Sequence, residues 1–219
     1  MLRFLLAHLF TYVLLSLANN AAWNFEYLDV EKVLDTFVEH LKYCSKLYFS
    51  LENKTFQYPY TSLVQSSGHG KSRLIKEASS KLYICYACIR KANEGYPEQT
   101  EAVSSLFTST LHFKECTSFI FTYYCLKKFY GWLSSDLADK SCTEWYKYQI
   151  NGLFWSEIVD ETLETAKKID DDSFPKLRDK LEKDLKVDLD MLNSKGSKSK
   201  MFNSSVVLYI ALDEARTLL

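Results

Sequence analysis

The chain has 219 residues, enough for one hydrophobic core and a small helical appendage. Its 27 basic and 28 acidic residues give a formal net charge of −1, which indicates neither a nucleic-acid-binding surface nor a charged membrane-binding face. Glycine (6) and proline (3) are scarce, which favours long helices over turn-rich β architecture, and the 15% aromatic content is typical of core packing.

Residues 1–20 are apolar after Arg3, and the segment Ser16-Leu17-Ala18 has the small residues of a cleavage site. The pattern predicts either a signal peptide over residues 1–18 or an apolar packing helix, with a misplaced gene start as a further alternative. The run is too short to predict a stable membrane span. The sequons at Asn53 and Asn203 would permit glycosylation of a secreted chain.

Residues 21–57 form the predicted helical N-terminal region. Residues 29–48 have apolar side chains at i, i+3, i+4 and i+7, which predicts an amphipathic helix that Asp29 can cap. Its expected apolar face consists of Val30, Val33, Leu34, Phe37, Leu41, Cys44 and Tyr48.

Residues 61–78 predict a phosphate-binding loop between a strand and a helix. A short apolar run at 61–64 precedes the sequence QSSGHGKS at 65–72, and helix-forming residues follow. This order matches the P-loop pattern G-x-x-x-x-G-K-S/T, in which backbone amides and a helix N-terminus surround a phosphate. Gln65 replaces the first glycine of the pattern, and the alternative is a Gly/Ser surface turn before a helix.

The loop pattern assigns chemical roles to its residues. We expect Lys71 to reach the β- and γ-phosphates of ATP and the Ser72 hydroxyl to bind Mg²⁺. The predicted helix starts near Gly70. The predicted nucleotide-binding residues are Ser67, Gly68, His69, Gly70, Lys71, Ser72 and Arg73.

Residues 81–88 form a second apolar run that predicts a strand. Cys85 and Cys88 would face opposite sides of it, and no second C-x-x-C is present, so a zinc or redox pair is not expected. We expect the six cysteines of the chain to be reduced and mostly buried.

Residues 100–200 are expected to be a large helical insertion. The periodicity predicts helices over 100–133 and 143–169, and a short charged helix after Ser173. The acidic triplet at 170–172 is interpreted as a solvated loop rather than a metal site. One face of the charged helix is predicted to carry Leu177, Leu181, Leu185, Leu189 and Leu192.

Residues 205–212 form a continuous apolar run that ends at Asp213 and Glu214. A strand buried on both faces with a carboxylate at its end is the Walker B pattern of P-loop ATPases. Asp213 would hold the Mg²⁺ shell, and Glu214 would be the catalytic residue that polarises the attacking water. The alternative is an ordinary core strand that meets solvent at an acidic turn.

The segment 58–74 resembles the start of a group of uncharacterised fungal P-loop NTPases, AAA/STAND-like ATPase domains that read Q-S-S-G-x-G-K-S/T-R. Residues 95–97 and 212–216 are similar to theirs as well. The resemblance implies an ATP-binding domain in which Gln65 is the group's own variant. Some fungal and oomycete Crinkler-type effectors carry similar domains, but their N-terminal motif is not found here.

The predicted fold class is therefore α/β. We expect a small, incomplete P-loop NTPase-type parallel sheet from strands 61–65, 81–88 and 205–212, with the helical insertion between the second and third of these. Residues 58–219 would form this partial P-loop NTPase domain. Because the chain ends six residues after Asp213, the sequence suggests the front half of an ATPase, truncated after Walker B.

Two functions follow from the sequence. The first is an ATP-binding, Mg²⁺-dependent P-loop protein with weak or no hydrolysis, whose partners are a nucleotide and an unidentified protein, with no nucleic acid indicated. The second is a non-enzymatic interaction or effector-like protein on a degenerate ATPase scaffold. An ATP site favours the cytoplasm, and the alternative is secretion if residues 1–18 are a signal peptide.

Overall fold

The computed structural model describes residues 32–50, 70–89, 97–108, 115–135, 140–150, 152–169, 172–195 and 207–213. In these ranges the chain is mostly helical and carries one small parallel sheet. The helices are α2 (Val33–Ser50), α3 (Lys71–Ala78), α4 (Glu101–Thr108), α5 (Glu115–Ser134), α6 (Cys142–Ile150), α7 (Phe154–Lys167) and α8 (Phe174–Lys195). The strands are β1 (Tyr83–Cys88) and β2 (Leu208–Asp213). None of the helices described is long and apolar enough to cross a membrane.

The sheet confirms one part of the predicted topology. β1 and β2 are parallel and pair from Tyr83 with Leu208 to Cys88 with Asp213, although α4 to α8 separate them in the chain. The predicted strand 61–65 lies outside the described residues, as do residues 1–31. The place of strand 61–65 in the predicted sheet therefore stays a prediction.

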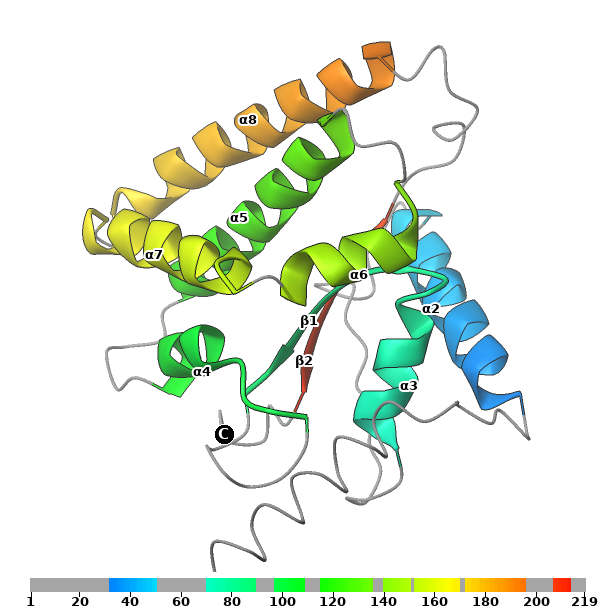
Figure 1. Cartoon of the computed structure of the whole chain (residues 1–219). Coiled ribbons are helices and arrows are strands. Elements are labelled where there is room, and N and C mark those ends of the chain that lie inside the picture. Colours follow the sequence, from blue (N-terminus) through cyan, green and yellow to red (C-terminus); the bar gives the residue numbers. More distant parts are fainter. Residues whose placement is uncertain are drawn as a thin grey trace, which may run out of the picture.

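Helices cover both faces of the strand pair (Figure 1). Successive side chains of a strand point to opposite faces, so each strand supplies two cores. Ile84 and Ala211 pack on the side of α2 and α3. Cys85 and Leu212 pack on the other side, in a core built with side chains from α4, α5, α6 and α7. α8 lies outside this second layer and packs along α5.

The outer edge of β1 is closed by side chains. The amide of Gln149, on α6, accepts a hydrogen bond from the backbone N–H of Tyr86 at 2.9 Å and donates to the carbonyl of Ile84 at 2.6 Å. Farther along, Thr100 accepts from the Cys88 N–H at 3.0 Å through Oγ1 and donates its own N–H to the Cys88 carbonyl at 2.8 Å. These bonds satisfy backbone groups that a further strand would otherwise pair with.

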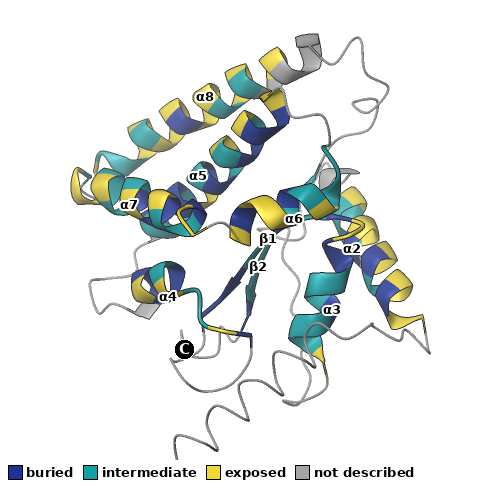
Figure 2. Ribbon diagram, viewed as in Figure 1, coloured by how far each residue is buried: buried dark blue, intermediate teal, exposed yellow. Residues whose placement is uncertain are grey.

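Aromatic rings fill the larger core, as the composition predicts. Trp145 and Phe129 are fully buried, with ring centroids 4.9 Å apart, and Phe154 meets Trp145 edge-on at 5.6 Å. Figure 2 shows that buried residues line the inner sides of α4, α5 and α7, whereas α8 is exposed along much of its length. This core positions β1 from the side opposite to α3.

The predicted amphipathic helix over 29–48 is confirmed as α2. Leu34, Val38 and Leu41 are buried against α3 and β1, in a cluster with Leu74, Ala78, Leu82 and Ile84. Val33 was expected on the apolar face but is 42% exposed, although the next residue, Leu34, is buried. Asp29, the expected cap, lies outside the described residues.

The helix predicted over 143–169 is wrong as one element. A turn at Gly152 and Leu153 divides it into α6 and α7. The two helices pack against different elements: α6 lies along β1, and α7 packs on α4 and α5. Trp145 of α6 and Ile158 of α7 are both buried in the larger core.

Two further expectations need correction. The charged helix after Ser173 is not short: α8 has 22 residues, and its leucine face packs through Leu177, Leu181 and Leu185 on α5. The strand predicted as buried on both faces is only partly buried in β2, where Asp213 alone is buried. The six cysteines are free thiols as predicted, and the buried ones are Cys85, Cys88, Cys116 and Cys125.

Candidate functional site

The predicted phosphate-binding helix begins where the sequence places it. Gly70 precedes α3 with φ of +75°, a left-handed conformation that glycine adopts without the strain of a side chain. Its carbonyl accepts the first helical hydrogen bond, from Leu74 N–H at 2.8 Å. Ser67, Gly68 and His69 lie outside the described residues. The helix start near Gly70 is confirmed, whereas the shape of the loop before it stays a prediction.

Ser72 and Asp213 meet at the end of the sheet, although they lie 141 positions apart in the chain. The Ser72 hydroxyl, in the first turn of α3, donates a hydrogen bond to Oδ2 of Asp213, the last residue of β2. α3 begins at the end of the molecule where both strands finish (Figure 1). The two residues predicted as metal ligands are thus in direct contact.

Asp213 is a buried carboxylate with only 5% of its surface exposed. Its backbone carbonyl accepts a hydrogen bond from Ile89 N–H at 3.0 Å, which fixes the strand end. Its side chain accepts a second hydroxyl bond, from Tyr86 on β1 at 2.8 Å. A buried carboxylate is costly unless donors or a cation compensate it. Both compensating groups seen here are neutral hydroxyls, and no ion pair among the described residues involves Asp213.

Tyr86 was not predicted as a site residue. Burial raises the pKa of its phenol well above the usual range, and the neighbouring Asp213 carboxylate raises this pKa further. The phenol therefore stays protonated and remains a hydrogen-bond donor. The only signal in the sequence is a tyrosine within an apolar strand, two residues before its end, which tertiary packing alone could turn into a contact.

Lys71 and Arg73 stand in the first turn of α3 beside Ser72. Lys71 is the first residue of the helix and is partly buried. Arg73 directs Nε to Oε1 of Glu77, one turn later, at 2.6 Å. Lys71 and Arg73 make the first turn of α3 basic, and the helix dipole adds positive charge there. Glu214, the predicted catalytic residue, lies outside the described residues.

The donor set suits one kind of metal. A hydroxyl and a carboxylate are hard oxygen ligands of the type that Mg²⁺ prefers, and Mg²⁺ sites commonly use one or two protein oxygens together with phosphate oxygens and waters. Across the described ranges, no group of three or more His, Cys, Asp and Glu side chains could hold a metal ion. Ser72 and Asp213 are oxygen ligands that would suit a magnesium ion, with a phosphate and water supplying its other ligands.

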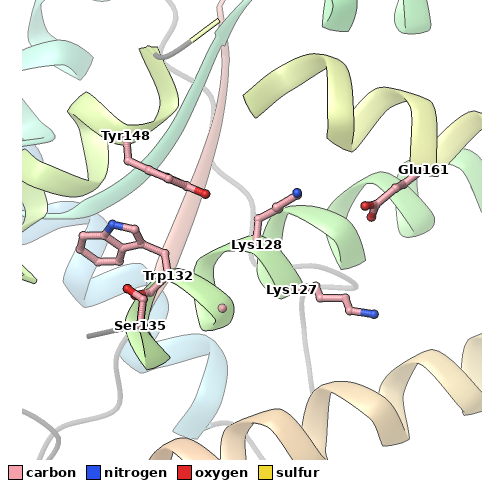
Figure 3. Close-up of a pocket in the computed structure, with 7 residues that line it drawn as sticks. Lys127, Lys128, Trp132, Ser135, Tyr148 and Glu161 are labelled. Atoms are coloured by element: carbon pink, nitrogen blue, oxygen red, sulfur yellow. The ribbon is translucent and has the colours of Figure 1, made fainter. Parts of the chain in front are cut away.

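A separate pocket of about 310 Å³ lies between α5, α6 and α7 (Figure 3). Two lysines in its wall are engaged: Lys128 Nζ lies 2.5 Å from Glu157, and Lys127 Nζ lies 3.4 Å from the Tyr123 hydroxyl. The lining residues are Lys127, Lys128, Gly131, Trp132, Ser135, Tyr148 and Glu161. None of them belongs to the predicted site, so this pocket is distinct from the contact of Ser72 with Asp213.

Comparisons with known proteins identify a family but no described function. No curated protein matches the chain, and no solved structure matches it. One family model matches residues 29–219, a range that includes every element from α2 to β2. The chain therefore belongs to the family described as Domain of unknown function (DUF8735).

Proposed function

We propose that the protein binds ATP together with Mg²⁺ at the start of α3 and the end of β2. The observation that carries the proposal is the hydrogen bond from the Ser72 hydroxyl to the buried Asp213 carboxylate. It joins a residue of the predicted P-loop to a residue of the predicted Walker B strand. The two residues lie 141 positions apart in the chain.

Each residue has a task in this proposal. Lys71 would contact the terminal phosphates, and the first turn of α3 would direct its positive dipole end at them. The Ser72 hydroxyl would give a lone pair to the metal while its O–H keeps donating to the Asp213 carboxylate, which keeps the hydroxyl oriented. When bound, Mg²⁺ would neutralise phosphate charge and link the nucleotide to both residues.

Further residues enter this proposal from the sequence. Gly68, His69 and Gly70 would let backbone amides approach the phosphates. Ser67 and Arg73 complete the predicted nucleotide-binding segment, although Arg73 is held by Glu77 along the helix. Glu214, next to Asp213 in the sequence, would act as general base if the nucleotide is hydrolysed.

Calorimetric titration with ATP tests the proposal. In Mg²⁺ buffer the wild-type chain should bind with a dissociation constant below about 1 mM. Lys71→Ala should weaken binding at least about tenfold, because it removes hydrogen bonds to a charged phosphate. Lys183→Ala on exposed α8 is the matched control and should bind like the wild type.

Two results would contradict ATP binding: no affinity below the millimolar range, or equal affinity in the wild type and Lys71→Ala. Release of phosphate from ATP is a separate measurement. If it occurs, Glu214→Gln should abolish it and leave ATP affinity in place, since the amide cannot accept a proton from water.

A further inference from the structure

The Asp213 carboxylate receives two hydroxyl donors on the same oxygen. Ser72 donates to Oδ2 from α3, and Tyr86 donates to Oδ2 from β1 at 2.8 Å. Within the described residues, Oδ1 receives no hydrogen bond. Both hydroxyl donors therefore bind Oδ2, and among the described residues Oδ1 accepts none.

Tyr86 reaches Asp213 because of the sheet register. Tyr86 pairs with Ala211 and Cys88 pairs with Asp213, so the tyrosine lies diagonally opposite the aspartate, on the neighbouring strand. Tyr86 and Ala211 both pack on the α2 and α3 side of the sheet. A long side chain spans such a diagonal pair on one face of a sheet.

The tyrosine is held in place by packing. It contacts the cluster that includes Leu74 and Ala78 of α3 and Val38 of α2. Its backbone N–H is bonded to Gln149, which anchors the strand from the other edge. The phenol is therefore a fixed donor, whereas a solvent-exposed hydroxyl would rotate among several acceptors.

We propose that Tyr86 is a positioning residue for the magnesium site, and this inference rests on the proposed function. Its phenol holds Oδ2 of Asp213 together with the Ser72 hydroxyl and leaves Oδ1 for the cation and its water ligands. Residues of this kind orient a metal ligand without touching the metal. Their mutation typically weakens metal affinity by about 10- to 100-fold.

The test separates affinity that depends on Mg²⁺ from affinity that does not. ATP affinity is measured in Mg²⁺ and again in EDTA for the wild type, Tyr86→Phe and Tyr83→Phe. Tyr83→Phe is the matched control, since it lies on the same strand but donates its hydroxyl to the Lys140 carbonyl at 2.6 Å. Tyr86→Phe should bind Mg·ATP about tenfold more weakly, with its affinity in EDTA unchanged. Tyr83→Phe should match the wild type in both buffers.

Equal Mg·ATP affinity in Tyr86→Phe and the wild type would overturn the role of Tyr86 while the proposed function stands. Absence of Mg²⁺-supported affinity in the wild type would contradict the proposed function itself. Loss of affinity in both buffers would assign Tyr86 to the fold rather than to the metal.

A second measurement does not depend on nucleotide. Tyr86→Phe should lower the urea midpoint of unfolding in the wild-type background and leave it unchanged in the Asp213→Ala background, because the partner of the phenol is then gone. The same loss in both backgrounds would show that the phenol acts through other contacts and would overturn the inference.

Discussion

Gln149 closes the outer edge of the sheet with one buried side chain. Its amide donates to Ile84 and accepts from Tyr86, and only 3% of its surface is exposed. A glutamine in an otherwise ordinary helical segment gives no sign of this role, because the partners lie on a strand more than 60 positions earlier in the chain. At this scale the sequence predicts a residue's chemistry but not its distant partners.

Gln149→Met should destabilise the protein by about 3 kcal/mol. The methionine keeps the volume of the side chain but leaves one buried N–H and one buried carbonyl unsatisfied. Chemical unfolding in urea measures the loss. Lys147→Met, on the same helix with its side chain 63% exposed, is the control and should change stability by less than about 0.5 kcal/mol. Equal stability of Gln149→Met and the wild type would show that the edge bonds contribute nothing.

α3 begins directly after Gly70, because glycine adopts the left-handed conformation there without the strain of a side chain. The sequence predicts this start, since the P-loop pattern places a glycine directly before the helix. It predicts the other helices less well. The break at Gly152 was missed because the apolar periodicity continues across it, and the division depends on which neighbours α6 and α7 pack against.

Gly70→Ala and Gly131→Ala should have opposite effects on stability. An added Cβ meets no atom within 4 Å at either position, so steric clashes do not explain the expected difference between the two variants. At Gly70, φ is +75°, and alanine there should cost about 1 kcal/mol. Gly131 lies within α5, where alanine should stabilise by roughly 0.5–1 kcal/mol. The free energy of unfolding is measured for both variants.

If Gly70→Ala proved as stable as the wild type, the left-handed start of α3 would be wrong. If Gly131→Ala were destabilising, the helical conformation of α5 at that position would be in doubt. The pair thus tests the backbone of two elements with the same chemical change.

At the scale of the whole molecule, the sequence and the parallel sheet together account for the contact between Ser72 and Asp213. Parallel strands bring their carboxyl ends to one edge of a sheet, so a strand ending in aspartate should lie near the start of a helix that follows a predicted phosphate loop. The structure brings the two residues together. Tyr86 was not predicted, because its contact depends on the strand register and on which face each residue occupies.

α2 packs on α3 and β1 in one cluster, so the whole described part should unfold as one unit. Leu41 of α2 is 8% exposed, and Leu41→Ala should destabilise by about 2–4 kcal/mol in a single transition. Tyr43→Ala on the outer side of α2, where Tyr43 is 63% exposed, should change stability by less than about 0.5 kcal/mol. Thermal unfolding followed by circular dichroism distinguishes one transition from two. A separate early transition in Leu41→Ala would show that α2 is an independent unit.

Paramagnetic broadening by Mn²⁺ tests most directly whether a metal and a nucleotide bind between α3 and β2. Mn²⁺ replaces Mg²⁺ at oxygen ligands and broadens the NMR signals of nearby nuclei. With ATP and Mn²⁺ present, the amide signals of Ser72 and Asp213 should broaden strongly, while Leu181 on α8 should be unaffected. Mn²⁺ without ATP is the control for binding to surface carboxylates. Unbroadened signals at Ser72 and Asp213, or broadening centred on the pocket of Lys128 and Tyr148, would contradict the proposed site.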